Sequence, residues 1–133
     1  MWGEKWEVWF IEGVIIIVKT YKDLDVFDGG YKLSLCIYKL TISYPKHEIY
    51  GITSQIRRAA VSVPLNIAEG YGRKSKEDFK RFLKISLGSV NETETLLELS
   101  KDLGYIEERK CEKLIEQYDI LGKKIYRLIE NWK

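Results

Sequence analysis

Residues 54–70 read SQIRRAAVSVPLNIAEG, and this stretch decides the fold. Its apolar residues recur at helical spacing, and one side of the predicted helix is formed by Ile56, Ala60, Val63 and Ile67. Pro64 stands inside this helix, where its ring removes a backbone hydrogen bond and costs about 3 kcal/mol unless neighbouring groups compensate. We therefore expect a helix that is kinked at Pro64 and closely surrounded by the rest of the chain.

Similar amphipathic patterns predict three further helices. Pro45 stops the first, Ser75 is placed as the N-cap of the third, and Gly104 lies just past the carboxyl end of the third. The four predicted helices cover residues 25–44, about 49–71, 75–104 with their caps, and 111–132. Because short loops join them, we predict an all-α fold, an antiparallel up-and-down four-helix bundle.

Residues 1–20 differ in character from the rest, so we place the bundle in residues 21–133. The apolar run 14–18 is far shorter than the ~20 residues of a membrane helix, and the segment lacks the features of a signal peptide. We therefore expect a cytoplasmic protein with no membrane partner. Three interpretations of the extension stay open: a strand or arm docking on another subunit, a floppy tail, or a leader translated from a start codon assigned too early. We favour the last, because Glu12-Gly13 can be encoded by a sequence resembling a ribosome-binding site.

Composition argues against catalytic and metal sites. His47 is the only histidine, so neither a Ser-His-Asp triad nor a histidine-rich metal site has its parts. Cys36 and Cys111 do not share a metal-ligand spacing and are predicted to be reduced core thiols. We expect no catalytic residue, no metal and no cofactor.

Positive charge is concentrated in residues 57–84, which carry eight basic and three acidic side chains, although the whole chain has a net charge of +2. Such asymmetry indicates an anionic partner, and phosphate is the group that arginine and lysine contact most readily. The predicted nucleic-acid-binding residues are Arg57, Arg58, Arg73, Lys80, Arg81 and Lys84. The other interpretation is a structural network of Ser62, Asn66 and Glu69 in which the carboxylate pairs with an arginine. The two interpretations are compatible, with some arginines in each role.

A second apolar group lies away from the predicted core side of the central helix, and the third helix shows a weaker version of it. The predicted oligomer-interface residues are Val61, Leu65 and Ala68 of the central helix with Ile85 and Leu96 of the third. Two helices with spare apolar sides favour self-association. A single wide core stripe is the alternative, because a kink at Pro64 blurs the helical angles.

The residues just described resemble a known family. The matching motifs are SQIRRAAVSVP at 54–64, NIAEG at 66–70, Arg73, the Phe79 to Leu83 segment, and LGS at 87–89, with a looser match from about 21 to 132. The chain resembles the four-helix-bundle proteins encoded in intervening sequences of bacterial large-subunit rRNA genes, which are related to the accessory variability determinant of diversity-generating retroelements.

This resemblance implies a homopentamer arranged as a barrel, with no known catalytic activity. The retroelement relatives imply an adaptor that binds reverse transcriptase and nucleic acid through basic surfaces, and motif position singles out Arg57, Arg58, Arg73 and Arg81. Two departures from the family pattern stand out. Gly29-Gly30 replaces helix-favouring residues, so we expect the first helix to fray, and Leu65 replaces a small polar residue, which enlarges the apolar side.

The leading hypothesis is therefore a non-enzymatic oligomeric scaffold that binds nucleic acid, RNA or DNA, or a nucleic-acid enzyme. The alternative is a protein-interaction module that binds no nucleic acid and whose basic surface is merely solvated.

Overall fold

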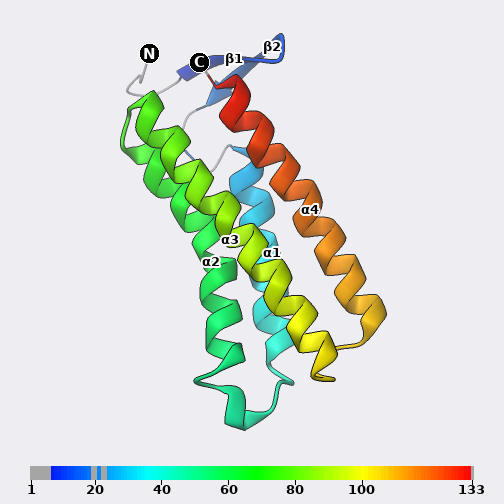
Figure 1. The fold of residues 1–133 in the computed structure, drawn as a ribbon. Helices are drawn as coiled ribbons and strands as arrows, with labels where there is room; N and C mark the ends of the chain where they lie inside the picture. The colour runs from blue at the N-terminus through cyan, green and yellow to red at the C-terminus, as the bar shows by residue number, and fades with distance from the viewer. Residues whose placement is uncertain (1–6, 19–20, 22–23, 133) are drawn as a thin grey trace.

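The computed structural model describes residues 7–18, 21 and 24–132. Its elements are the strands β1 (Glu7–Ile11) and β2 (Val14–Val18), the helices α1 (Asp25–Thr41), α2 (Ile52–Gly72), α3 (Lys76–Asp102) and α4 (Glu108–Asn131), and the short 3-10 turn η2 (Lys46–Glu48). Successive helices run in opposite directions (Figure 1). Each helix packs against two neighbours, in the order α1, α2, α3, α4 and back to α1. The predicted four-helix bundle is confirmed.

The extension forms an antiparallel hairpin, so the fold is a helical bundle with one two-stranded element added. β1 pairs with β2 from Glu7 opposite Val18 to Ile11 opposite Val14. Glu12 and Gly13 both take positive φ, 50° and 78°, as a two-residue hairpin turn of the primed type requires. The hairpin gives residues 7–18 a strand geometry, and its docking on another subunit stays a prediction. The early start codon stays a prediction, and residues 1–6 and 19–20 lie outside the described part of the chain.

α2 continues through Pro64 because a side chain from α1 replaces the missing hydrogen bond. In an unbroken helix the carbonyl of Ala60 would accept from the amide of residue 64, and proline has none. The hydroxyl of Ser34 lies 3.0 Å from this carbonyl and 2.9 Å from the carbonyl of Gly30, in its own helix. Ser34 is therefore the compensating neighbour that the sequence pattern required. The kink at Pro64 stays a prediction.

The expected fraying at Gly29-Gly30 is wrong, and close packing explains why. Gly30 is buried inside α1, and a Cβ at this position would lie 3.0 Å from Val63 Cγ1 and 3.4 Å from Pro64 Cδ. Glycine thus lets α1 approach α2 next to the proline. The conformational cost of a helical glycine is offset by this contact.

The core runs the length of the bundle and closes on aromatic side chains near the ends of α2 and α4. Phe79 and Trp132 are almost wholly buried there, and their rings meet edge to face at 5.0 Å between centroids; Tyr118 is equally buried in the middle of α4. Cys111 is buried as predicted, whereas Cys36 is exposed, which corrects the prediction of two core thiols. Cys36 borders a groove between α1 and α4 instead of pointing between the helices.

Candidate nucleic-acid interface

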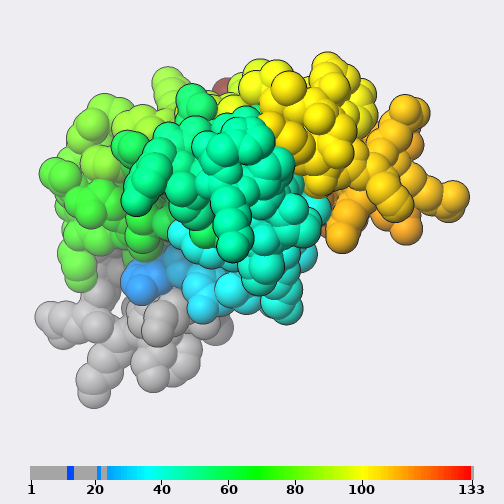
Figure 2. Space-filling model, turned by 90° about the horizontal axis from the view of Figure 1, so that it is seen from below, coloured from blue at the N-terminus to red at the C-terminus, as the bar shows by residue number. Residues whose placement is uncertain are grey.

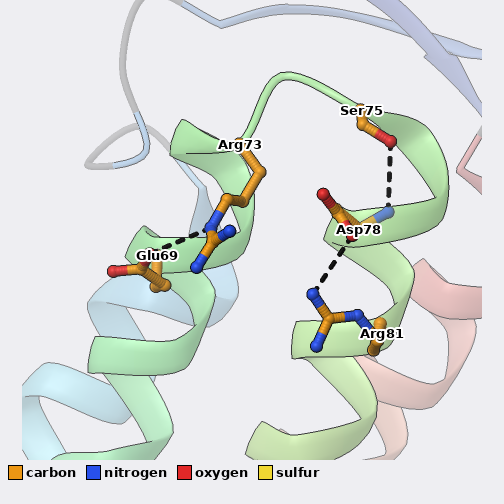
Figure 3. A network of polar contacts seen from close by, with 5 residues as sticks. All are labelled: Glu69, Arg73, Ser75, Asp78 and Arg81. Carbon is orange, nitrogen blue, oxygen red and sulfur yellow. Dashed lines mark hydrogen bonds and ion pairs between the residues drawn. The ribbon is translucent and has the colours of Figure 1, made fainter.

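The turn between α2 and α3 holds two arginines in fixed positions (Figure 3). Ser75 is the N-cap of α3, and its hydroxyl accepts a hydrogen bond from the amide of Asp78 at 3.3 Å. The Asp78 carboxylate in turn accepts from Arg81 at 3.1 Å. On the other side of the turn, Glu69 accepts from Arg73 at 3.0 Å. Each arginine is therefore oriented by a carboxylate one helical turn away.

Phe82 brings the two arginines to one place. The guanidinium carbons of Arg73 and Arg81 lie 5.1 and 4.6 Å from the centroid of the Phe82 ring, within the range of cation–π attraction. The ring can lie there because residue 70 is glycine: a Cβ on Gly70 would come 2.5 Å from Phe82 Cβ. The NIAEG motif thus serves the arginine pair as well as the packing of α2 on α3.

Both arginines remain open to solvent despite these contacts. Their side chains are 48% and 57% exposed. Lys74 takes a left-handed backbone conformation, with φ of 56°, and turns the chain from α2 into α3. We name the residues around this turn the basic cluster: Arg73, Lys74, Lys76, Lys80, Arg81 and Lys84. Its six cations face three nearby carboxylates, those of Glu69, Glu77 and Asp78, so an excess of positive charge remains.

The structure separates Arg57 and Arg58 from this cluster, so the six predicted nucleic-acid-binding residues do not lie together on one surface. Sixteen residues of helix between positions 57 and 73 amount to about 24 Å. Arg57 donates to the Thr41 hydroxyl at 2.8 Å and stacks on Tyr38 at 4.7 Å, near the opposite end of the bundle. Helical periodicity places residues on one side of a helix, but it does not bring them together along its axis.

The predicted polar network is also divided. The hydroxyl of Ser62 lies 2.8 Å from that of Ser89 on α3, and the Asn66 amide donates to the Ser62 hydroxyl at 2.8 Å. These three residues tie α2 to α3. Glu69 is not part of this network, because its carboxylate pairs with Arg73.

The predicted self-association residues differ in exposure. Leu65 and Ile85 are 60% and 44% exposed, and Val61 and Ala68 are half-buried. Leu96 is only 6% exposed and belongs to the core, which corrects its assignment to an interface. Leu96 is buried because α2 and α4 enclose α3, so the buried side of α3 is wider than a single helical stripe.

Sequence reasoning missed a row of apolar residues on α1. The row consists of Tyr31, Leu35, Tyr38 and Ile42, which are 45% to 77% exposed. Their spacing of i, i+4, i+7 and i+11 is the heptad pattern of a helix-packing surface and could have revealed them. The core residues of α1 alternate with this row along the sequence, so the periodicity of the core side masks a second apolar side.

A carboxyl pair lies in the groove between α3 and α4. Burial raises the pKa of Glu94 to about 7, and hydrogen bonding and repulsion from the neighbouring Asp119 carboxyl add to the effect. The groove is also lined by Lys123 and Arg127. Glu94 therefore titrates near neutral pH.

The raised pKa of Glu94 predicts that the stability of the protein depends on pH. The pKa of Glu94 is about 7 in the folded protein, against an ordinary value of 4.5. The stabilisation from its protonated form is therefore complete below pH 4.5 and is lost as the pH rises through about 7. Replacing Glu94 with glutamine should remove this decline, as measured by urea unfolding across that range. Glu92→Gln, on the exposed side of the same helix, is the control. An unchanged pH profile in Glu94→Gln would contradict the assignment.

Comparison with known proteins supports the resemblance seen in residues 54–70. The family model described as 23S rRNA-intervening sequence protein matches residues 22–127. The chain belongs to this family. A crystal structure of a protein with unknown function from the S23 ribosomal protein family of Bacteroides thetaiotaomicron VPI-5482 is similar, with a TM-score of 0.73 and 26% sequence identity. That match covers 80% of this chain and 96% of the other. No curated protein matches the chain.

Two further findings concern residues 7–18, 21 and 24–132. No helix among them is long and apolar enough to cross a membrane. Nor do these residues contain a group of three or more histidine, cysteine, aspartate or glutamate side chains that could hold a metal ion. In this member of the 23S rRNA-intervening sequence protein family, the basic cluster holds two arginines that are oriented by carboxylates and stacked on Phe82.

Proposed function

We propose that the protein is a non-enzymatic, cytoplasmic, homo-oligomeric scaffold that binds nucleic acid through the basic cluster. The observation that carries this proposal is the pair Arg73 and Arg81, held by carboxylates, stacked on Phe82 and still exposed. Prepositioned guanidinium groups bind phosphate oxygens at a low entropic cost. Such contacts position a nucleic acid without reading its sequence.

The test is the salt dependence of binding to RNA and to DNA. Replacing Arg73 and Arg81 with glutamine should weaken binding and reduce the slope of log affinity against log salt by about 1.4–1.8, the value for two lost phosphate contacts. Fluorescence anisotropy at several salt concentrations measures both quantities. Arg109→Gln with Lys110→Gln on α4 changes the net charge equally and should leave the slope unchanged. Equal losses of affinity in the two variants, or an affinity that does not change with salt concentration, would rule out the basic cluster as the binding site.

Self-association is the second part of the proposal, and the exposed apolar side chains of α1 and α2 support it. The family resemblance implies five copies, so we expect a solution mass near five times the chain mass of 15.6 kDa. A reverse transcriptase or another nucleic-acid enzyme is a further partner that such a scaffold would hold.

Replacing Leu65 with glutamate should lower the mass measured by light scattering, because a charge would be buried in an apolar contact. Ile120→Glu is a matched control, since Ile120 is 44% exposed on α4 and lines the α1–α4 groove. If the Leu65→Glu mass equals that of the unaltered protein, the α2 residues do not form the interface. If the unaltered protein binds no nucleic acid but does assemble, the interaction-module alternative gains support.

A further inference from the structure

A small pocket opens at the end of the bundle that lies opposite the turn between α2 and α3 (Figure 1). It is formed where the loop of residues 42–51 joins α1 to α2, and its volume is about 310 Å³. Figure 2 looks onto this end, where the α1–α2 loop lies beside the α3–α4 loop. We name it the loop-end pocket, and the lining residues that matter here are Thr41, Ile42, Lys46, Ile49, Thr53 and Arg57. Its volume falls at the lower end of the range for small-molecule sites.

Arg57 is held in a fixed position at the wall of this pocket. Its Nε donates to the Thr41 hydroxyl at 2.8 Å, and its guanidinium carbon lies 4.7 Å from the centroid of the Tyr38 ring. Thr41 is buried, and its own hydroxyl donates to the Ile37 carbonyl at 2.8 Å. Within residues 7–18, 21 and 24–132, the two terminal nitrogens of Arg57 have no hydrogen-bond partner. They are therefore available to bind an anion through two parallel hydrogen bonds.

Lys46 supplies a second cation, and no carboxylate lines the pocket. Neither Lys46 nor Arg57 forms an ion pair with another described residue. Glu48 is the carboxylate of this loop, but its oxygens already accept from the Ile52 amide at 3.1 Å and from the α3–α4 loop at 2.7 Å. The positive charge of the pocket is thus left without a partner in this part of the chain.

Thr53 gives an independent indication of a ligand. The residue lines the pocket and is only 2% exposed, and its hydroxyl oxygen is buried without a hydrogen-bond partner among the described residues. Such a hydroxyl lowers stability, because it has lost its contact with water and gained nothing in exchange. Thr53 also lies in the first turn of α2, where the helix dipole favours negative charge. An anion that accepted a hydrogen bond from Thr53 would satisfy this group.

We propose that the loop-end pocket binds a phosphate group, either free phosphate or that of a nucleoside monophosphate. A phosphate monoester carries about two negative charges at pH 7 and has three free oxygens, which match two cations and a hydroxyl donor. A carboxylate has one charge and would leave one cation unmatched. The exposed side chains of Ile42 and Ile49 border the pocket and can contact the apolar part of a nucleoside. This site shares no residue with the basic cluster, so the inference goes beyond the proposed function and does not rest on it.

Calorimetric titrations of the full chain with inorganic phosphate, adenosine monophosphate and adenosine, at constant ionic strength, test the ligand class. We expect one site per chain for the two phosphates and no binding of adenosine. Tighter binding of the nucleotide would assign the site to nucleotides, and equal affinities would assign it to free phosphate. Equal affinities for adenosine and its monophosphate, or no binding of any of the three, would overturn the proposal.

Two neighbouring arginines provide a matched pair of variants. Arg57→Gln should weaken phosphate binding about tenfold or more, because it removes charge-assisted hydrogen bonds. Arg58→Gln makes the same change in charge at an exposed position outside the pocket, so its affinity should stay within about twofold of the unaltered protein. Equal losses of affinity in the two variants would mean that phosphate responds to net charge and not to this pocket.

Thr53→Val separates a binding role from a structural one. The substitution removes the hydroxyl and keeps the branched shape, so we expect lower phosphate affinity together with an unchanged or higher midpoint of urea unfolding in phosphate-free buffer. A lower midpoint with unchanged affinity would show that the hydroxyl is structural, and it would remove Thr53 from the site.

The double variant Arg73→Gln with Arg81→Gln distinguishes this site from the basic cluster. It should keep its affinity for inorganic phosphate while its affinity for nucleic acid falls. If it loses phosphate binding while Arg57→Gln retains it, the loop-end pocket is not the site, although the proposed function stands. If phosphate binding depends on Arg57 but the unaltered protein binds no nucleic acid, the pocket stands and the proposed function fails.

Discussion

Replacing Gly70 with alanine is expected to lower the free energy of unfolding by about 1–3 kcal/mol, the usual cost of forcing extra atoms into a packed core. The new Cβ would lie 2.5 Å from Phe82 Cβ and 3.3 Å from Phe79 Cδ1. Phe82 Cβ is held by the backbone of α3, so α2 and α3 must move apart. The better helix propensity of alanine offsets only part of this cost. Urea unfolding measures the difference.

Gly72 supplies a matched control two residues away. A Cβ at Gly72 would meet no atom within 4 Å. Gly72→Ala should therefore leave stability unchanged or raise it by up to about 1 kcal/mol. Equal losses of stability in the two variants would show that the contact with Phe82 is not the cause.

Gly70→Ala also tests the link between packing and the basic cluster. If Phe82 shifts, the support beneath Arg73 and Arg81 shifts with it, and nucleic-acid affinity should fall below that of Gly72→Ala. Anisotropy measurements at a temperature where both variants are folded separate this effect from unfolding.

Replacing Ser34 with alanine is expected to cost about 1–3 kcal/mol, because it leaves the buried carbonyl of Ala60 without a donor. The single hydroxyl proton of Ser34 is shared with the Gly30 carbonyl, but that carbonyl can also accept from the helix backbone of α1. Ser43→Ala is the control: its hydroxyl lies 3.1 Å from the Leu40 carbonyl on the exposed end of α1, and the loss should stay within about 0.5 kcal/mol.

A substitution at Pro64 tests whether the cost of Ser34→Ala comes from the hydrogen bond that the proline removes. In a Pro64→Ala background the amide of residue 64 can bond to Ala60, so Ser34→Ala should cost less there than in the unaltered protein. A double-mutant cycle from urea unfolding gives the coupling free energy between positions 34 and 64. A coupling near zero would mean that the Ser34 hydroxyl does not replace the hydrogen bond lost at Pro64.

The helices themselves could be predicted because their signals are local. The apolar spacing of residues 54–70 and the Ser75 cap depend on neighbours within one or two turns, and the structure places both as expected. Leu96 could not be assigned in this way, because its burial depends on how far α2 encloses α3. Nor could the separation of Arg57 from Arg73 be judged from helical angles, which carry no information on axial distance.

The sequence by itself determined four helices, the caps of the third helix and a proline that had to be compensated, since these follow from helical periodicity and backbone chemistry. The tertiary structure alone decided that Ser34 supplies the compensating hydrogen bond and that Gly30 and Gly70 allow close contact. It also decided that Phe82 gathers two arginines and that Leu96 is buried in the core. The reason is physical: these contacts join residues of different helices, and only the packing of the helices sets the distances between them.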